Sequence, residues 1–262
     1  MISSLSNSQM KKISLLLKKS KAREEQGMFV VEGQKMFEEA RSLNLLVTAY
    51  FSESFYRERL ETDPDFFCKM EYEVVTDSVF NGVSETKSPQ GILGIVKASA
   101  YSFEQMVEST NSCLLLLEDI RDPGNLGTMI RTAEGAGMTG IILNSSCVDI
   151  YNPKVIRSTM GSIFRMPFYL SVDFYSDILK LKKRGIKIVA AHLSGKTYDI
   201  DGCFKQKCAI MIGNEANGLT EESSSLADCL VRIPMAGQVE SLNAAIAAAI
   251  LMYEASRQRR IG

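Results

Sequence analysis

Histidine and tryptophan are almost missing from this sequence, which has one histidine, His192, and no tryptophan in 262 residues. A catalytic triad would therefore have to depend on His192 alone, which argues against that class of hydrolase. The six cysteines form no C-x-x-C pair. This argues against a zinc site, and a chain of this length can bury a large core without a disulfide framework. We expect reduced thiols, a cytoplasmic location and no bound metal.

Long apolar runs and an excess of charge of one sign are also missing. The longest apolar run, Ala244–Tyr253, is shorter than the ~18 residues that indicate a membrane span. The N-terminus has no apolar core of a signal peptide, so we expect no membrane association. A net charge of −1 argues against a uniformly basic surface but allows a local basic patch. The length predicts two domains.

The first hundred residues alternate between short apolar and amphipathic segments. An amphipathic helix is expected over Ser8–Arg23, and its lysines form either a solvated face or a face that contacts phosphates. The pattern predicts a small α/β domain over residues 1–98, followed by a linker over 99–112 that contains a possible short helix at Phe103–Glu108. The strands expected in this domain are Phe29–Val31, Val47–Phe51, Tyr72–Val75 and Ile92–Val96, and the helices are Gln34–Ser42 and Phe55–Thr62.

The second half, residues 113–262, alternates more regularly. Strand–helix alternation predicts a parallel sheet covered by helices on its faces. The expected strands are Cys113–Leu117, Gly140–Leu143, Phe168–Leu170, Ile186–Ala190, Cys208–Ile212 and Leu230–Ile233. The expected helices are Thr128–Ala136, Pro153–Met160, Tyr175–Lys183, Thr220–Asp228 and Ser241–Arg257.

Three glycine-containing polar loops follow apolar strands of this second half. The first contains Asn125 and leads to Arg131, the second contains Glu215, and the third contains Ser241 and Asn243. Each loop alone is consistent with an ordinary strand–loop–helix connection. Together they indicate a site, because ligands of open α/β sheets bind at the carboxyl edge of the strands. No dinucleotide fingerprint or P-loop is present, which disfavours a nucleotide-binding metabolic enzyme.

The order and spacing of these loops resemble a known family. Its three motifs are matched by Asp122–Thr128 with Arg131–Ala133, by Gly213–Glu215 with Gly218–Leu219, and by Ile233–Met235 with Ser241–Asn243. They resemble the SpoU family of the SPOUT class, which are S-adenosylmethionine-dependent RNA ribose 2′-O-methyltransferases. Asn152–Gly161 is similar to the helix between the first two motifs. More weakly, Phe29–Gly33 and Gln90–Ile92 resemble a substrate-binding domain with a ribosomal-protein-like RNA-binding fold.

The resemblance implies an architecture and an activity. The fold would be α/β: a C-terminal parallel-sheet SPOUT domain with a deep trefoil knot, preceded by the small α/β substrate-binding domain. The protein would methylate a ribose 2′-hydroxyl of structured RNA, ribosomal rather than transfer RNA, as a homodimer formed through the knot domain. Ala244, Ala248 and Met252 would pack either within the knot or across that interface. The alternative is a catalytically silent RNA-binding protein that acts in ribosome assembly.

The resemblance also implies the site residues. The catalytic positions are Asn125, Arg131, Glu215, Ser241 and Asn243, and the positions that bind S-adenosylmethionine are Leu193, Ser194, Gly195, Gly213, Ile233, Met235 and Leu242. Arg131 is the family position usually assigned to the attacking hydroxyl. A guanidinium with a pKa above ~12 is a poor base, so we interpret Arg131 as a group that binds an RNA phosphate and orients the ribose. For Ile233 and Leu242, packing in the core remains an alternative role.

Overall fold

The chain forms two compact units in the computed structural model, which describes residues 1–199 and 202–261. The first unit comprises Met1–Ser99 with Tyr151–Phe164, and the second comprises Ala100–Ile150 with Arg165–Gly262. The chain therefore leaves the second unit after Ile150, adds a short piece to the first unit, and returns. Neither unit is one continuous segment.

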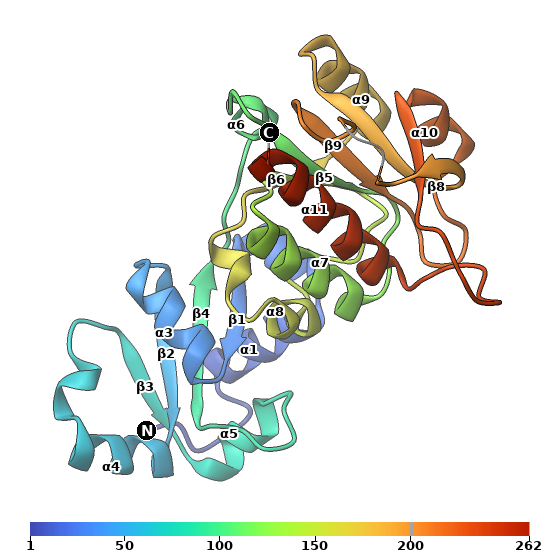
Figure 1. Ribbon diagram of the computed structural model, residues 1–262. Coiled ribbons are helices and arrows are strands. Elements are labelled where there is room, and N and C mark those ends of the chain that lie inside the picture. The colour runs from blue at the N-terminus through green and yellow to red at the C-terminus, as the bar shows by residue number, and fades with distance from the viewer. Residues whose placement is uncertain (200–201, 262) are drawn as a thin grey trace. The chain divides into compact units, whose positions relative to one another are not determined.

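The first unit is built on a four-stranded sheet in the order β1-β4-β2-β3 (Figure 1). Strand β4 runs antiparallel to β1 and β2, and β2 runs parallel to β3. The elements are α1 (Ser8–Lys18), α2 (Ser20–Gln26), β1 (Met28–Glu32), α3 (Gln34–Ser42), β2 (Leu46–Ser52), α4 (Glu53–Thr62), η1 (Pro64–Phe67), β3 (Tyr72–Val75), α5 (Asp77–Val83), β4 (Ile92–Lys97), α8 (Pro153–Thr159) and η2 (Ser162–Phe164).

The helix expected over Ser8–Arg23 is in fact two helices. Helix α1 ends at Lys18 and α2 begins at Ser20, with an extended Lys19 between them. Arg23 is buried and donates hydrogen bonds to the carbonyl oxygens of Leu16 (2.5 Å) and Leu17 (3.2 Å) at the end of α1. Arg23 thus satisfies carbonyls that a helix end leaves free, and it does not belong to the basic face formed by the exposed lysines of this segment.

Helix α8 belongs to the first unit although its sequence lies between the motifs of the second. Its Val155 and Ile156 are buried. The ring of Tyr151, just before α8, stacks on Phe29 of β1 with 4.5 Å between the ring centroids. The ring centroid of Phe164 lies 6.1 Å from that of Phe29. This insertion buries Phe29 almost completely.

The second unit is built on a six-stranded parallel sheet in the order β10-β8-β9-β5-β6-β7. This confirms the expected parallel α/β architecture. The elements are α6 (Phe103–Val107), β5 (Cys113–Leu117), α7 (Pro123–Ala136), β6 (Gly140–Asn144), β7 (Phe168–Ser171), α9 (Phe174–Lys183), β8 (Lys187–Thr197), β9 (Cys208–Ile212), α10 (Glu221–Leu226), β10 (Cys229–Arg232) and α11 (Ala244–Ile261).

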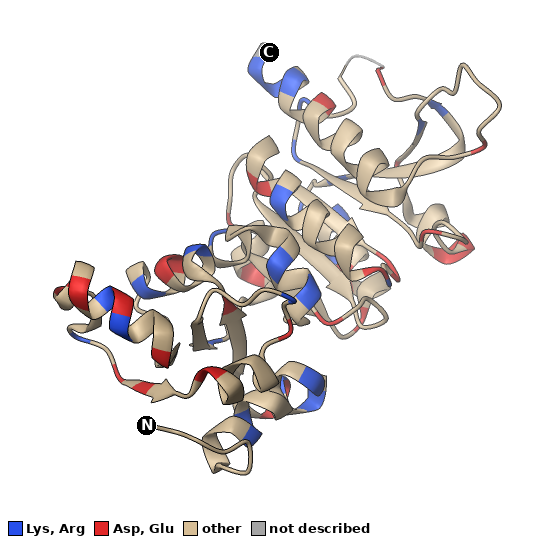
Figure 2. Ribbon diagram, turned by 90° about the horizontal axis from the view of Figure 1, so that it is seen from below, with Lys and Arg blue, Asp and Glu red and all other residues tan. Residues whose placement is uncertain are grey.

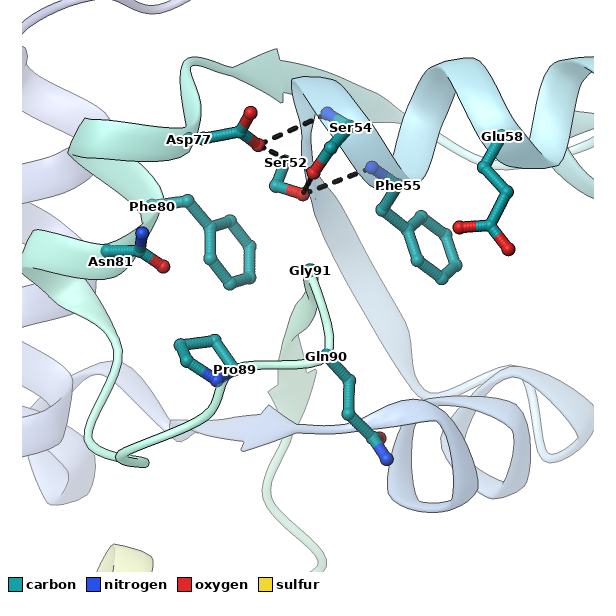
Figure 3. Close-up of a pocket in the computed structure, with 10 residues that line it drawn as sticks. All are labelled: Ser52, Ser54, Phe55, Glu58, Asp77, Phe80, Asn81, Pro89, Gln90 and Gly91. Atoms are coloured by element: carbon teal, nitrogen blue, oxygen red, sulfur yellow. Dashed lines mark hydrogen bonds between the residues drawn. The ribbon is translucent and has the colours of Figure 1, made fainter.

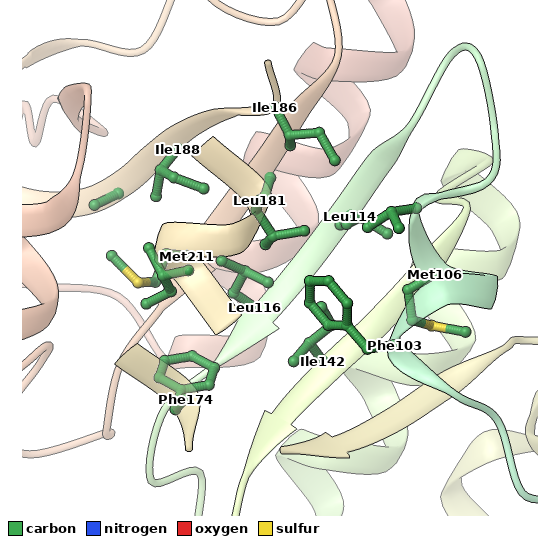
Figure 4. Packing of buried hydrophobic residues seen from close by; sticks show 14 residues of the cluster. Phe103, Met106, Leu114, Leu116, Ile142, Phe174, Leu181, Ile186, Ile188 and Met211 are labelled. Atoms are coloured by element: carbon green, nitrogen blue, oxygen red, sulfur yellow. The ribbon is translucent and has the colours of Figure 1, made fainter. Parts of the chain in front are cut away.

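Alternate residues of these strands face two helical layers. On one face Leu114 and Leu116 of β5 pack with residues of α6 and α9, and Figure 4 shows the rings of Phe103 and Phe174 in this cluster. On the other face α7 and α11 lie side by side, as Figure 1 shows. Both helices therefore start at the same edge of the sheet.

The segment expected as a linker, residues 99–112, carries helix α6. Ser102 and Gln105 form a reciprocal capping box at its start. Phe103, Met106 and Val107 are buried in the core of the second unit. This segment is therefore part of the second unit's packing.

Two helices that carry the sequence motifs begin at other residues than expected. Helix α7 begins at Pro123, because Asp122 accepts a hydrogen bond from the Asn125 N–H (2.7 Å) and proline suits the first helical position. Helix α11 begins at Ala244, after Asn243 and not at Ser241. The Asn243 Oδ1 accepts from the N–H groups of Ala245 (2.9 Å) and Ile246 (3.3 Å).

Strand β8 is longer than the strand expected at Ile186–Ala190. Strand β10 pairs with it twice, with Leu230 opposite Ala190 and the next residue, Val231, opposite Lys196. Gly195 lies against this crossing, because a Cβ there would be 2.5 Å from backbone atoms of Leu230 and Val231. Within the described residues, none of the helices is long and apolar enough to cross a membrane.

Candidate active site

A chain of hydrogen bonds joins the three motif segments at the carboxyl edge of the second unit's sheet. The Asn125 Nδ2 donates to Glu215 Oε1 (3.0 Å), and the Asn243 Nδ2 donates to Asn125 Oδ1 (2.9 Å). The Asn243 Oδ1 is held in turn by the first N–H groups of α11. These contacts fix the direction of both amides, from the carboxylate at one end to the helix N-terminus at the other.

Glu215 is held as a carboxylate. Burial acts to raise its pKa, but hydrogen bonds from the Asn125 side chain and from backbone N–H groups, including those of Asp122 and Arg121, lower its pKa below the ordinary value overall. The Asp122 and Arg121 N–H groups lie 3.2 and 3.3 Å from its oxygens, at the N-terminus of α7. A carboxylate with these donors is a weak base at neutral pH. Glu215 therefore fixes the direction of the Asn125 amide.

Two acidic residues that were not identified from the sequence, Glu118 and Asp119, connect the first motif segment with the second. The buried Glu118 accepts hydrogen bonds from the Thr220 N–H (2.9 Å), the Thr220 hydroxyl (2.9 Å) and the Ser223 hydroxyl (2.7 Å). The Asn214 Nδ2 donates to the backbone oxygen of Asp119 (2.9 Å). Both contacts tie the first motif segment to the second. An acidic residue directly after five apolar strand residues was the available sequence signal for Glu118.

We expect Glu118→Ala to lower the free energy of unfolding by about 3 kcal/mol. It leaves the buried hydroxyl of Ser223 and the part-buried N–H of Thr220 without an acceptor, and a buried unsatisfied group costs about 1–3 kcal/mol. Urea denaturation measures the effect. The matched control is Glu221→Ala, which removes an exposed carboxylate from the first turn of α10. Equal stabilities of the two variants would contradict the role given to Glu118.

A cavity of about 300 Å³ lies beside the hydrogen-bonded chain. Its walls are mostly apolar and backbone, with Glu215 and Ser241 among the lining residues. Five of the seven predicted cofactor positions line it, and Ser194 and Gly195 do not. The predicted residues in its lining are Leu193, Gly213, Ile233, Met235 and Leu242, and residues that the sequence analysis missed include His192, Asn214, Leu219, Val231, Ala247 and Leu251.

Gly213 allows two backbone segments to meet at the cavity. A Cβ at this position would lie 2.2 Å from the carbonyl carbon of Gly218 and 2.3 Å from the nitrogen of Leu219. Asn214 and Gly218 also exchange backbone hydrogen bonds of 3.0 and 2.9 Å, which close the loop. Only glycine fits here, and the exposed backbone forms part of the cavity wall.

Ser194 and Arg131 do not join this chain of hydrogen bonds and do not line the cavity. Ser194 donates from its N–H to His192 Nδ1 (3.2 Å), and its hydroxyl lies 2.7 Å from the same nitrogen. Arg131 follows Asn125 by six residues on α7, so it points ~120° away around the helix. Its side chain is exposed and has no hydrogen bond or ion pair within residues 1–199 and 202–261. Arg131 is thus an exposed cation in the second half of α7 with no partner among the described residues.

The residues at the cavity fit S-adenosylmethionine. Apolar walls with a few polar groups and a volume of this order are typical of sites for small molecules and cofactors. The carboxylate of Glu215 adds a negative charge suited to a sulfonium cation. Among the described residues, no group of three or more His, Cys, Asp and Glu side chains is placed to hold a metal ion.

Comparison with known sequences matches both halves of the chain. The model of the SpoU rRNA Methylase family matches residues 112–253, and that of the MRM3-like substrate binding domain matches residues 7–94. The 23S rRNA (guanosine(2553)-2'-O)-methyltransferase RlmP of Bacillus subtilis is 31% identical over 89% of this chain and 90% of its own length. The human mitochondrial rRNA methyltransferase 3 is 30% identical over 95% of this chain and 72% of its own length.

Solved structures of rRNA methyltransferases are also similar to this chain over almost its whole length. The AdoMet-bound rRNA methyltransferase from Sinorhizobium meliloti has a TM-score of 0.84 and 30% identity, covering 98% of this chain and 97% of that one. The SpoU methyltransferase AviRb from Streptomyces viridochromogenes, in complex with the cofactor AdoMet, has a TM-score of 0.87 and 27% identity, covering 98% and 99%.

Fold, cavity and motif residues together define an S-adenosylmethionine-dependent RNA 2′-O-methyltransferase. The chain belongs to the SpoU rRNA Methylase family. The sequence-based expectations of family, activity and cofactor are confirmed.

Proposed function

We propose that this enzyme methylates a ribose 2′-hydroxyl of ribosomal RNA at the edge where Glu215, Asn125 and Asn243 meet. The observation that carries this proposal is their continuous chain of hydrogen bonds beside the cavity. The named relatives of both halves act on ribosomal RNA, which supports this substrate over transfer RNA.

The residues of the site divide the work between holding the cofactor and aligning the ribose. Gly213, Ile233 and Leu242 are proposed to hold S-adenosylmethionine, together with Leu193 and Met235. Ser194 and Gly195 are proposed to shape the adjoining part of β8. The cofactor supplies an electrophilic methyl group. Ser241 lines the cavity and has no hydrogen-bond partner within the described residues, so its hydroxyl is available to the ribose.

Alignment is proposed to contribute most of the rate enhancement. Glu215 is already saturated with donors and Arg131 is a cation, so neither is a competent base at neutral pH. Fixing two reacting groups in line can contribute ~7–11 kcal/mol. Asn125 and Asn243 form the surface that the ribose contacts, and Arg131 binds a phosphate of the RNA. The proton of the 2′-hydroxyl passes to water as the methyl group is transferred.

RNA binding is proposed to rest on a few local cations. Figure 2 shows Lys and Arg interspersed with Asp and Glu in both units. Lys11, Lys18 and Lys21 are exposed on α1 and α2, and Lys154 is exposed on α8 of the same unit. Few phosphate contacts give a shallow dependence of affinity on salt concentration.

Two further features of the family are proposed for this chain. One is the trefoil knot, which would account for the close passage of Gly195 over Leu230 and Val231. The other is a homodimer formed through the knot domain. Exposed apolar side chains of α11, Ile246 and Tyr253, support that interface, whereas Ala244, Ala248 and Met252 are buried within the chain itself.

We expect S-adenosylmethionine to bind the purified protein at one molecule per chain in a calorimetric titration. Ribose methylation of ribosomal RNA from a deletion strain then identifies the modified nucleotide. If the protein binds S-adenosylmethionine but does not methylate RNA from that strain, the result would instead support a catalytically silent RNA-binding protein. Folded protein that binds no cofactor even with RNA present would contradict the enzyme.

A further inference from the structure

A second pocket lies in the first unit, at the end of its sheet where β2 stops and β4 starts. Its volume is about 220 Å³, less than the ~300–1,000 Å³ of pockets for drug-sized ligands. Figure 3 shows Phe80 and Phe55 on either side of the pocket, with Ser52, Ser54 and Asp77 closing one end. The lining is completed by Glu58, Asn81, Pro89, Gln90 and Gly91.

The wall of this pocket is held in place by two sequence segments that lie far apart in the chain. Glu32 accepts hydrogen bonds from the Ser84 and Thr86 hydroxyls and from the Glu85 N–H (3.2 Å), which anchors the start of the segment before β4. The end of that segment is anchored by the Gln34 N–H, which donates to Gln90 Oε1 (2.8 Å). The wall is therefore ordered before any ligand arrives.

Gly91 shows how tightly this end of the sheet is built. Its φ is +76°, and a Cβ there would lie 2.6 Å from Ser52 Oγ and 2.7 Å from Phe55 Cβ. The Gly91 carbonyl accepts from the Ser52 N–H (2.9 Å). The Glu32–Gly33 and Gln90–Gly91 pairs, which the sequence resemblance singled out, thus meet beside the same pocket.

Several polar groups of the pocket have no partner in the protein. The side chains of Asn81 and Glu58 make no hydrogen bond or ion pair within the described residues, nor does the Gln90 Nε2. Asp77 uses one oxygen, which accepts from the Ser54 N–H (3.1 Å) and hydroxyl (2.8 Å). No hydrogen bond to its second carboxylate oxygen is found among the described residues, so this oxygen can accept from a ligand. The Ser54 N–H, followed by its hydroxyl, lowers the pKa of Asp77, which keeps it ionised at neutral pH.

The chemistry of these groups selects the ligand. None of the ten lining residues is Lys or Arg, and two are acidic, so the lining itself offers no cation to a phosphate. Carboxylates accept from amino groups of bases, and unpaired RNA bases are recognised by aromatic walls and hydrogen bonds along their edges. Cytosine presents an amino group that can donate to a carboxylate. Uracil presents a carbonyl oxygen at the same position, and two acceptors that face each other disfavour binding.

We propose that this pocket binds one unpaired base of the RNA substrate, and that Asp77 and Asn81 select a base with an exocyclic amino group. The inference rests on the proposed function, because it takes RNA as the substrate. It assigns recognition of a base to a place outside the methyl-transfer centre. The first unit thereby recognises the identity of a base in addition to binding the RNA backbone.

The test compares binding of two labelled probes, decacytidylate and decauridylate, to the full-length protein by fluorescence anisotropy. We expect decacytidylate to bind roughly tenfold tighter, within the range that one good base contact contributes. Asp77→Asn should bring the ratio of affinities to about one or below, because an amide can donate to the uracil oxygen. Asn81→Ala, at an exposed residue without a partner in the described chain, should lower the ratio without affecting folding.

Glu61→Gln is the matched control, since Glu61 is exposed on α4 one turn beyond Glu58 and does not line the pocket. It should leave the ratio unchanged. Equal affinities of the unmodified protein for the two probes, or a ratio that survives both pocket substitutions, would overturn the proposal. Methylation of ribosomal RNA is measured separately with the same proteins. Its absence would refute the proposed function, whereas the probe ratio needs no cofactor and tests the pocket alone.

Discussion

Arg131→Ala is expected to slow single-turnover methyl transfer by ~10²-fold or more while S-adenosylmethionine still binds, because misplacing a reacting group by about 1 Å can have that effect. Arg131 is exposed and unpaired within the described residues, and it does not line the cavity. Its removal therefore affects the ribose and not the cofactor. Rapid quench with ribosomal RNA measures the rate, and calorimetry measures cofactor binding.

Arg131→Lys separates two roles of this cation. Lysine retains the charge but not the planar, bidentate donors of a guanidinium. If Arg131 only supplies charge to a phosphate, the lysine variant keeps most of the rate with tight RNA binding; a loss as large as that of alanine would show that the guanidinium shape is needed. Arg184→Ala, directly after α9, is the control, since Arg184 is exposed and lies outside the site, paired with Glu104 at 3.8 Å.

Gly213→Ala is expected to weaken binding of S-adenosylmethionine by roughly 100-fold. The added methyl group would meet backbone atoms of Gly218 and Leu219 at 2.2 and 2.3 Å, and backbone cannot rotate away as a side chain can. Overpacking costs ~1–3 kcal/mol, and each ~1.4 kcal/mol is a factor of ten in affinity. The loop that forms the cavity wall has to open to accommodate the change.

Gly237→Ala is the matched control for this substitution. Gly237 lies in the third motif loop, and a Cβ there would meet no atom within 4 Å. Calorimetric titration should give nearly unchanged affinity for this variant. Unchanged affinity of Gly213→Ala would show that the close approach at Gly213 does not support the cavity. Melting temperatures of both variants show whether a loss of binding reflects global unfolding.

Sequence patterns predicted the alternation of strands and helices and the three motif segments, because buried parallel strands such as Cys113–Leu117 are almost wholly apolar. They were less accurate at helix starts. Ser241 and Asn243 are both good capping residues, and local preference does not choose between them. In the structure Asn243 caps α11, and its side chain also donates to Asn125, which is 118 residues away in the sequence.

Other features depend on contacts that no local pattern contains. The sequence placed Asn125 and Arg131 together, but the helix turns Arg131 away from the chain of hydrogen bonds. Glu118 directly follows an apolar strand, and only its contacts with Thr220 and Ser223 explain why a carboxylate is buried there. The pocket around Asp77 and Gln90 likewise depends on sheet pairing.

The insertion of α8 into the first unit limits how the molecule can be divided. A polypeptide ending at residue 98 lacks Tyr151 and Phe164, whose rings cover Phe29. Such a fragment would expose the side of β1 on which α8 packs, and exposed apolar surface beside a strand promotes self-association. RNA-binding studies of the isolated N-terminal part therefore need residues 151–164 joined to it by an engineered connection, or the intact chain.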